Sequence, residues 1–497
     1  MNQTNEQSEI SADLDTQLNN GNLSLSKLKE VLQVYADIQF PTLPQMEISD
    51  KLLAYYCEGM IDKTEMNKYF INVCEYLNLT YHENDKGLGT SLELQLPLLE
   101  SKHTFSDMLL SLFAGNLIMY WEGAEHFYAV NVSKIPQRSL QESNTEISIK
   151  GPKDAFTEDL YLNMSLIRKR LHTDQLYSEQ FIIGSISNTK TILLYLNHKA
   201  NSNMIAEARK RLETIQLESL NSSGQLEQWL SDRSFSIFPL IDYIGRPDFV
   251  VDSLLRGRFA IIVEGSPMVL IAPSNFFELL KSPEDVHTTY YLVIFQRALR
   301  IVGLLLSVFL PGFWIAFANV NLDQIPFTLL ATVNISRDGV PLPTFLEAFL
   351  LLFQFELLRE AGVRLPKAVG QTIGIVGGLI IGESLIRAGL ASPTLLVVIA
   401  VSVVATFSLV NQSLSGTVSI LRFFILLVSA FLGVYGFLFC MFLILIYLCK
   451  LNSFGMNYLE PITSLKLKDI LTALLYDPFR RSYSSSVTRK YERRKKR

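Results

Sequence analysis

Side chains able to bind or conduct an ion lie within an otherwise apolar segment, residues 343–361. The polar members of this segment are Glu347, Gln354, Glu356, Arg359 and Glu360. On a helix with about 100° per residue, Glu347 and Gln354 lie about 20° apart, and the other three lie roughly opposite. Ionisable groups in lipid are costly, so they usually face a bundle interior or water. The pattern is typical of a re-entrant or pore-lining element. An amphipathic helix in the membrane interface, with its charges solvated, is the alternative.

Histidine and cysteine give no support to metal or catalytic chemistry. The six histidines are scattered, and the four cysteines form no C-x-x-C pair. The signatures H-E-x-x-H, G-x-S-x-G and G-x-x-x-x-G-K-[ST] are also absent from the sequence. The missing motifs do not exclude an enzyme, but nothing in the sequence proposes one. Our prediction is therefore no catalytic residues, no cofactor and no metal site, in a protein that is not an enzyme.

Charge is distributed unevenly along the 497 residues. Residues 301–450 contain 13 charged side chains, or 9%, whereas 23% of the remaining residues are charged. This division excludes a wholly soluble enzyme and a wholly embedded carrier, and the composition excludes collagen, a disulfide scaffold and general disorder. A formal net charge of −4 argues against a nucleic-acid partner.

Four apolar stretches are long enough to cross a membrane, which takes about 20 residues of helix. The uncharged runs are Ile301–Leu322, Ala368–Gly382 with an extension to Ile386, Ala388–Leu421 with its span at about 393–410, and Phe423–Cys449. Glu383 lies within the extension of the second span and is a further pore or gate candidate. The region between the first two spans either re-enters the membrane or crosses it twice, which gives four or six spans.

The second span has a strong helix-packing pattern. Gly370, Gly374, Gly378 and Gly382 recur every four residues, with Gly377 beside them. Successive G-x-x-x-G motifs leave a flat stripe on which another helix can approach closely. The partner helix lies either in the same chain or in a neighbouring one.

The basic end of the chain predicts the membrane orientation. Residues 480–497 hold nine Lys and Arg and one acid, Glu492. Such a segment belongs on the cytoplasmic side, and membrane lipids are its expected contact. The first 45 residues contain no leader-like apolar run and read as a disordered segment. Both terminal regions are therefore expected on the cytoplasmic side, which requires an even number of spans.

The soluble half reads as two α/β subdomains, at residues 46–136 and 137–290, ahead of a membrane domain at 291–455 and a basic tail at 456–497. Ser106–Val132 and Pro247–Ala272 both predict a helix, a strand, a glycine turn and a strand, which is a weak internal repeat. A helix is expected from about Asp154 to a basic end. That end, Arg168, Lys169 and Arg170, is either a solvated helix terminus or a docking surface for a partner. The fold class is thus an α+β soluble region followed by an α-helical transmembrane bundle.

Several long motifs resemble the A subunit of the GerA family of spore germinant receptors. They are GPKDAFTEDLYLNMSLIRKRL (151–171), IGRPDFVVDSLLRGRFAIIVEGSPMVL (244–270), LREAGVRLPKAVGQTIGIVGGLIIGESLIRAGLASP (358–393) and NSFGMNYLEPIT (452–463). They occur in the same order as in the family and span residues 146–463. Residues 104–140 resemble the family more loosely, and residues 1–100 only weakly.

The resemblance implies a multi-pass protein of the inner membrane of bacterial spores. It implies assembly with a transporter-like B subunit and a lipoprotein C subunit, and homo-oligomerisation. It also implies a nutrient-gated ion channel that triggers spore germination, with nutrient recognition assigned to the B subunit. Two alternatives stay open, a non-conducting scaffold subunit and a secondary transporter. The short segments 325–335 and 343–361 suggest the transporter.

Overall fold

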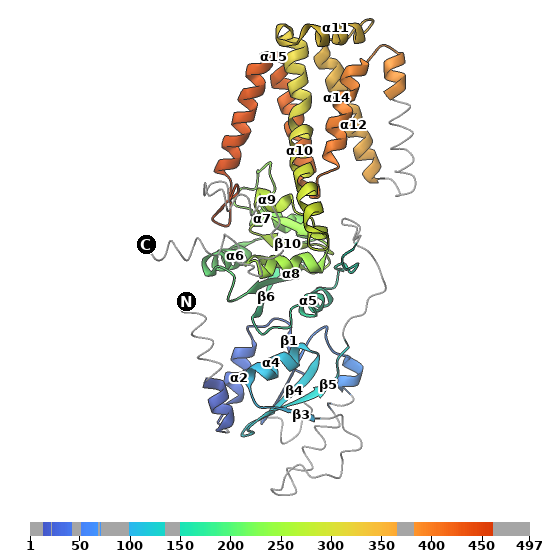
Figure 1. Ribbon diagram of the computed structural model, residues 1–497. Helices are drawn as coiled ribbons and strands as arrows, with labels where there is room; N and C mark the ends of the chain where they lie inside the picture. The colour runs from blue at the N-terminus through green and yellow to red at the C-terminus, as the bar shows by residue number, and fades with distance from the viewer. Residues whose placement is uncertain are drawn as a thin grey trace. The chain divides into compact units, whose positions relative to one another are not determined.

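The computed structural model describes most of the chain as two compact units. The described residues are 13–20, 22–41, 51–67, 70, 99–134, 150–364 and 382–460. Unit 1 comprises the described residues up to Ser234 together with Ile241–Pro273, and unit 2 comprises Phe235–Leu240 and the described residues from Ser274 onward. Figure 1 labels helices and strands of both units.

The first half of unit 1 is a five-stranded antiparallel sheet with the order β1-β2-β4-β5-β3. Its strands are β1 (Ile38–Gln39), β2 (Leu52–Cys57), β3 (Leu99–Lys102), β4 (Asn116–Trp121) and β5 (Phe127–Asn131). Helix α2 (Leu25–Leu32) precedes the sheet and α4 (Phe105–Phe113) connects β3 to β4. The prediction that residues 1–45 form a disordered segment is wrong for α2 and β1, because Leu28 and Leu32 bury one apolar face of that helix.

The second half of unit 1 is another five-stranded antiparallel sheet, with the order β6-β7-β9-β10-β8. Its strands are β6 (Leu176–Ile183), β7 (Thr189–Leu196), β8 (Asp242–Ile244), β9 (Phe259–Val263) and β10 (Val269–Ala272). The helices are α5 (Leu160–Arg168), α6 (Ser202–Thr214), α7 (Ser223–Leu230) and α8 (Pro247–Leu255). Helix α5 begins later than expected because Asp159 caps it, accepting a hydrogen bond from Leu162 N at 2.8 Å.

The two sheets have the same topology. If β1 to β5 are matched in order with β6 to β10, and α4 with α8, the two strand orders become identical. The predicted repeat is therefore confirmed as an arrangement of helix, strand, turn and strand in both halves. Gly123 and Gly265 adopt the positive φ angles that the two glycine turns require.

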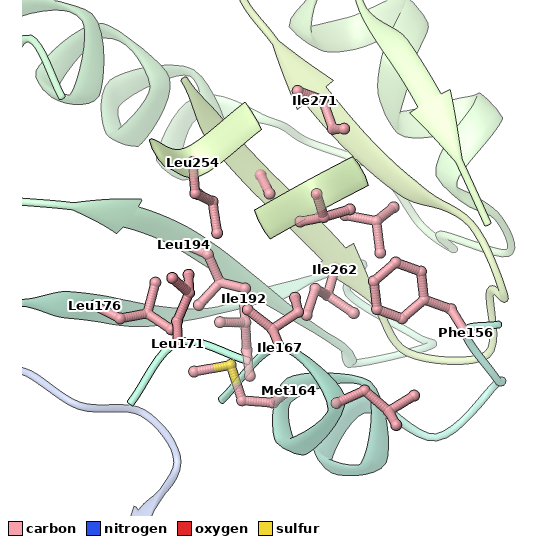
Figure 2. Close-up of a cluster of buried hydrophobic side chains, with 14 of the residues drawn as sticks. Phe156, Met164, Ile167, Leu171, Leu176, Ile192, Leu194, Leu254, Ile262 and Ile271 are labelled. Atoms are coloured by element: carbon pink, nitrogen blue, oxygen red, sulfur yellow. The ribbon is translucent and has the colours of Figure 1, made fainter. Parts of the chain in front are cut away.

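Two helices cover the second sheet and enclose its core (Figure 2). Met164 and Ile167 of α5 and Leu254 of α8 pack against Ile192 and Ile262 of the central strands β7 and β9, and all are buried. The central strands are almost fully buried, since β9 is buried at every position and β7 at all but Lys190. Burying side chains of this size contributes about 1.5–3 kcal/mol each, so the packed layers hold α5 in a defined position.

Glu227 makes the stability of unit 1 depend on pH. Burial, with a further contribution from the nearby charge of Asp242, raises the pKa of Glu227 to about 7. The folded protein therefore retains a proton between pH 4.5 and pH 7 that the unfolded chain has released, and stability falls as the pH rises through this window. Glu227→Gln should leave the free energy of unfolding unchanged at pH 4, where the carboxyl is protonated in both states. At pH 8 the substitution removes a buried charge and should stabilise unit 1 by about 2 kcal/mol. Chemical denaturation at both pH values measures the change in the free energy of unfolding. Equal changes at pH 4 and pH 8 would contradict the raised pKa of Glu227.

Unit 2 is helical. It begins with α9 (Phe276–Leu279) and the 3₁₀ turn η1 (Pro283–Val286), followed by α10 (Tyr290–Ile315), which continues as η2 (Ala316–Val320) and η3 (Leu322–Gln324). The remaining elements are α11 (Phe327–Ser336), α12 (Thr344–Arg364), α14 (Pro393–Thr406), α15 (Gln412–Lys450) and the small hairpin β11 (Asn452–Ser453) and β12 (Met456–Asn457). Helices α10, α12, α14 and α15 pack together as a bundle, and α11 lies across one end (Figure 1).

Helix α15 is a hairpin of two antiparallel helices that meet at Gly433, whose φ of 59° and ψ of −140° are not helical. Thr417 Oγ1 donates to Ile237 O at 2.6 Å, and Tyr447 Oη accepts from Ile237 N at 3.1 Å. In a straight helix these two side chains would be about 45 Å apart, at 1.5 Å per residue. Contact with the same residue therefore requires the chain to reverse between them.

In the described residues, two helices have the length and hydropathy of a membrane span, Tyr290–Val320 and Gln412–Lys450. Tyr290–Val320 contains most of the first predicted span, Ile301–Leu322. The prediction of Phe423–Cys449 as one span is wrong, because the chain reverses within it at Gly433. The predicted third span forms only the 14 residues of α14, which is shorter than a full crossing. The second predicted span lies almost wholly outside the described residues. Four or six spans therefore remain a prediction.

Candidate functional site

All the predicted pore or gate residues except Glu383 lie on α12, which packs against the bundle along one face. Ala348, Leu351 and Leu352 are buried against Leu395 and Ile399 of α14 and against Leu426 and Ala430 of α15. The helix begins at Thr344, one residue after Pro343. A proline at this point costs nothing because the first N–H groups of a helix have no partner within the helix. Two groups of polar side chains extend from α12 into the bundle.

Glu347 holds the beginning of α14. Its carboxylate is 0% exposed, and Oε1 accepts hydrogen bonds from Ser392 N at 2.6 Å and from Ser392 Oγ at 2.5 Å. Ser392 is the residue that precedes the first turn of α14, where N–H groups are unpaired and the helix dipole favours an anion. Glu347 Oε2 lies 3.8 Å from Arg337 Nε, too long for a hydrogen bond. Within this single chain, Glu347 therefore links α12 to the beginning of α14 by hydrogen bonds.

Replacement of Glu347 should destabilise unit 2 measurably. Glu347→Ala leaves the Ser392 N–H buried without an acceptor, so we expect a loss of about 1.5–3 kcal/mol in the free energy of unfolding. Ser392→Ala removes only the hydroxyl and should cost about 1 kcal/mol. Thermal unfolding of the full-length protein in detergent compares both with Asp323→Ala, which changes an exposed acid of η3. If Glu347→Ala and Asp323→Ala unfold at the same temperature, the carboxylate does not fasten α14.

A second polar cluster joins α12 to α14 and α15. Glu356 pairs with Arg359 and lies 3.4 Å from Arg422 Nη2, and Arg359 Nη1 donates to Ser419 Oγ at 2.9 Å and to Ser415 Oγ at 3.3 Å. Arg422 Nη1 lies 3.4 Å from the hydroxyls of Ser402 and Thr406 on α14. The interpretation of Glu356 and Arg359 as merely solvated is wrong, because both engage side chains of α15.

Sequence reasoning missed Arg422. It separates two uncharged runs of 34 and 27 residues and was not among the candidate site residues. In the structure it lies within the first helix of the α15 hairpin and is 2% exposed. A single arginine between two such runs was the available signal, because a helix continuing through it places a charge in an apolar bundle.

The remaining predicted residues of this group are less enclosed. Gln354 is half-buried, and Glu360 is exposed. Glu383 is exposed and pairs with Arg387 at 2.6 Å, one turn further along. Of the glycine stripe, Gly370, Gly374, Gly377 and Gly378 lie outside the described residues. Gly382 is described, and a Cβ added there would meet Leu396 at 3.8 Å, an ordinary contact.

A buried ion-pair network was also missed at the beginning of α10. Asp285, in the capping box of η1, accepts from Arg297 Nε at 2.9 Å and from Arg300 Nη2 at 2.9 Å. Arg300 also donates to Leu280 O at 3.1 Å. The sequence shows these arginines only as charges ahead of an apolar run. Their fixed pairing holds the first turns of α10 against the η1 turn.

The predicted docking surface at residues 168–170 needs correction. Arg168 is 1% exposed and is not available to a partner. It lies between the two halves of unit 1, where Nε and Nη2 donate to Asp37 at 2.7 and 2.9 Å and the guanidinium stacks 3.6 Å from the Phe113 ring centre. Arg170 pairs with Asp154 and is half-buried. Only Lys169 is exposed, and it alone could contact a partner.

The ion pair in unit 1 is completed by further hydrogen bonds to Asp37. Ser178 Oγ donates to Asp37 Oδ1 at 2.8 Å, and Cys57 Sγ donates to Oδ2 at 3.3 Å. Burial alone would raise the pKa of the Asp37 carboxyl, but the charge and hydrogen bonds of Arg168 outweigh it and hold that pKa below its usual value. The stability from Asp37 is therefore present above the unfolded-state pKa and is lost as the pH falls through the folded-state pKa.

Metal chemistry has no site in the part of the chain that the structure describes. No group of three or more His, Cys, Asp or Glu side chains there could hold a metal ion. The polar clusters instead join elements that are far apart in the sequence, and they leave charged groups inside an apolar helical unit.

Comparison with known proteins adds the following similarities. The family described as "Bacillus/Clostridium GerA spore germination protein" matches residues 26–489. Spore germination protein XA of Bacillus anthracis is 41% identical over 431 residues, which are 86% of this chain and 88% of that protein. Spore germination protein KA of Bacillus subtilis (strain 168) is 32% identical over 430 residues, 86% of this chain and 79% of that one.

A solved structure was also found. It is the crystal structure of the N-terminal domain of the A subunit of the Bacillus megaterium spore germinant receptor GerK3. It is 29% identical, covers 51% of this chain and 95% of that chain, and superposes with a TM-score of 0.37.

Proposed function

Because this chain belongs to the GerA family of spore germination proteins, we propose that it is the A subunit of a nutrient germinant receptor that oligomerises into an ion channel. The match over residues 26–489 carries the assignment to the receptor. The proposed role is non-enzymatic. Its proposed partners are a transporter-like B subunit, which binds the nutrient, and a lipoprotein C subunit. The proposed location is the spore inner membrane, with both terminal regions on the core side.

Membrane insertion of unit 2 is supported by its helices. Tyr290–Val320 and Gln412–Lys450 are long and apolar, and many of their large side chains face outward. Ionisable residues between such helices usually mark a functional site or an ion path, because their desolvation costs several kcal/mol. Glu347, Glu356, Arg359 and Arg422 are residues of this kind in the described part of unit 2.

Oligomerisation is supported by the outward face of α12. Leu346, Phe349, Phe353 and Leu357 are exposed at intervals of three and four residues and form an apolar stripe along the helix. The opposite face is buried against α14 and α15. In a membrane such a stripe contacts either lipid or another copy of the chain. We propose that copies associate so that Gln354 and Glu360 present oxygens to a cation path.

Planar-bilayer recordings of the purified full-length chain test conduction. We expect cation currents, and we expect Gln354→Leu combined with Glu360→Gln to reduce single-channel conductance severalfold. Both residues are incompletely buried, so this variant should fold. Glu213→Gln, at an exposed position of α6 in unit 1, is the matched control and should conduct normally. Unchanged conductance in the double variant would refute the proposed path. Absence of any current, with conduction arising only when another subunit is added, would favour the scaffold.

A further inference from the structure

Arg422 is a buried cation whose hydrogen bonds are poor. It is 2% exposed, and all its contacts with Glu356, Ser402, Thr406 and Ser419 are 3.4–3.5 Å long. Its Nε is buried and has no hydrogen-bond partner in the described structure. Arginine bonds to carboxylates and phosphates are normally about 2.7–2.9 Å long. A buried charge is tolerated only when it is well paired, so this guanidinium requires a further anionic partner.

The charges of the cluster point to the same requirement. Two guanidinium groups, Arg359 and Arg422, share one carboxylate, Glu356, which lies closer to Arg359. Both guanidinium groups also approach Ser419 Oγ, at 2.9 and 3.5 Å, so they converge on one position. The cluster therefore has an excess positive charge and several N–H donors. This donor set suits a tetrahedral oxyanion such as phosphate.

The adjoining sequence cannot supply the missing anion. No Asp or Glu occurs between Glu360 and Glu383, a stretch that includes Arg364 and Lys367. Glu360 itself is exposed, and Glu383 pairs with Arg387. The nearby hydroxyls of Ser402 and Thr406 accept from Arg422 Nη1 at 3.4 Å, but they are neutral and do not balance its charge.

The cluster is partly exposed, and several apolar side chains on the same two helices are exposed as well. The Arg359 and Glu356 side chains are 32% and 26% exposed, whereas Arg422 lies behind them. Phe353 and Leu357 of α12 and Ile420 and Phe424 of α15, which are close to these polar residues in the sequence, are also exposed. Ser415, which contacts Arg359, is in the first turn of α15, so the cluster lies near a helix end. Polar headgroups meet the ends of membrane helices, and basic pockets between helices bind anionic lipid headgroups.

We propose that Arg359 and Arg422 bind the phosphate of an anionic phospholipid between α12 and α15. The phosphate oxygens accept from the Arg422 Nε that has no other partner and from Arg359, and the acyl chains lie against the exposed apolar side chains. The proposal depends on the membrane location of unit 2 and is independent of ion conduction. A lipid bound at this site would stabilise the packing of α12 against α15.

Thermal unfolding of the full-length protein in neutral detergent, titrated with phosphatidylglycerol, measures the binding. Phosphatidylcholine and inorganic phosphate are titrated in parallel. We expect phosphatidylglycerol to raise the unfolding temperature saturably and phosphatidylcholine to have no effect. Arg422→Gln and Arg359→Gln should each weaken the apparent affinity by at least about tenfold. Arg359→Lys should restore only part of it, because lysine lacks the planar fork.

Matched variants and the parallel titrations make the outcome decisive. Arg387→Gln removes an exposed arginine of the same unit and should bind the lipid as the unmodified protein does. Should Arg422→Gln fail to fold, Arg359→Gln and Ser419→Ala test the same position from side chains that are easier to replace. Saturable stabilisation by inorganic phosphate without phosphatidylglycerol would retain the oxyanion site and overturn the lipid as its source. Equal effects of both lipids, or equal affinities of Arg359→Gln and Arg387→Gln, would overturn the site.

Discussion

Asp37→Ala is expected to lower the free energy of unfolding of unit 1 by about 3–5 kcal/mol. The substitution leaves Arg168 buried between the two sheets without its carboxylate partner, beside the rings of Tyr35 and Phe113. Ser178 Oγ and Cys57 Sγ lose the same acceptor. An uncompensated buried guanidinium costs far more than the loss of an exposed ion pair, which is worth about 0–1 kcal/mol.

Hydrogen–deuterium exchange of the full-length protein in detergent measures this loss at amides of β2 and α5. The matched control is Asp154→Ala, which breaks the partly exposed pair with Arg170 and should cost about 1 kcal/mol or less. The double variant Asp37→Leu with Arg168→Met removes both charges and should recover much of the stability. If the amides of β2 exchange as slowly in the Asp37→Ala protein as in the Asp154→Ala protein, the buried ion pair does not stabilise the packing of the two halves of unit 1.

Gly433→Ala should disrupt the reversal of α15 and destabilise unit 2 by at least about 2–3 kcal/mol. The backbone angles at Gly433, φ 59° and ψ −140°, are nearly restricted to glycine. An added Cβ would also lie 2.1 Å from Asn321 Oδ1 and 2.8 Å from Val320 Cγ1. Asn321 cannot move freely, because its Oδ1 accepts from Val434 N at 3.0 Å and satisfies the backbone beyond the break.

Gly416→Ala provides the control for this prediction. Gly416 is within the first helix of the α15 hairpin, and a Cβ there would meet nothing within 4 Å. Alanine is favoured over glycine inside a helix by about 1 kcal/mol, so this variant should be as stable as the unmodified protein or more so. Thermal unfolding in detergent compares the two variants. A Gly433→Ala protein that unfolds at the same temperature as Gly416→Ala would show that the reversal tolerates a side chain.

Local patterns in the sequence were sufficient to predict the repeated arrangement of helix and strands in unit 1. Each copy combines an apolar helix, an apolar strand and a glycine turn within fewer than 30 residues, and both copies form as predicted. Amphipathic spacing and turn chemistry act over a few residues, so they can be read without the fold. The same locality explains the error at the first 45 residues, where the packing of α2 overrides a polar composition.

The path through unit 2 was only partly predictable. The apolar runs that form α10 and α15 follow from composition, since they have the length and hydropathy of spans. The reversal within α15 did not follow, because one glycine within a run of apolar residues is compatible with a straight helix. The need for glycine at position 433 follows only from the folded structure, in which Asn321 and Val320 pack closely against its backbone.

The sequence by itself determined the family, the division into a charged half and an apolar half, and the elements whose residues lie close together in the chain. Only the tertiary structure decided which charges are paired. Asp37 meets Arg168 across 131 positions, Ser392 meets Glu347 across 45, and Arg422 meets Glu356 across 66. The physical reason is that the energy of a buried charge depends on the nearest opposite charge in space, and the folding of distant segments sets that distance. Arg168 could therefore be mistaken for a surface residue, and Arg422 could be overlooked.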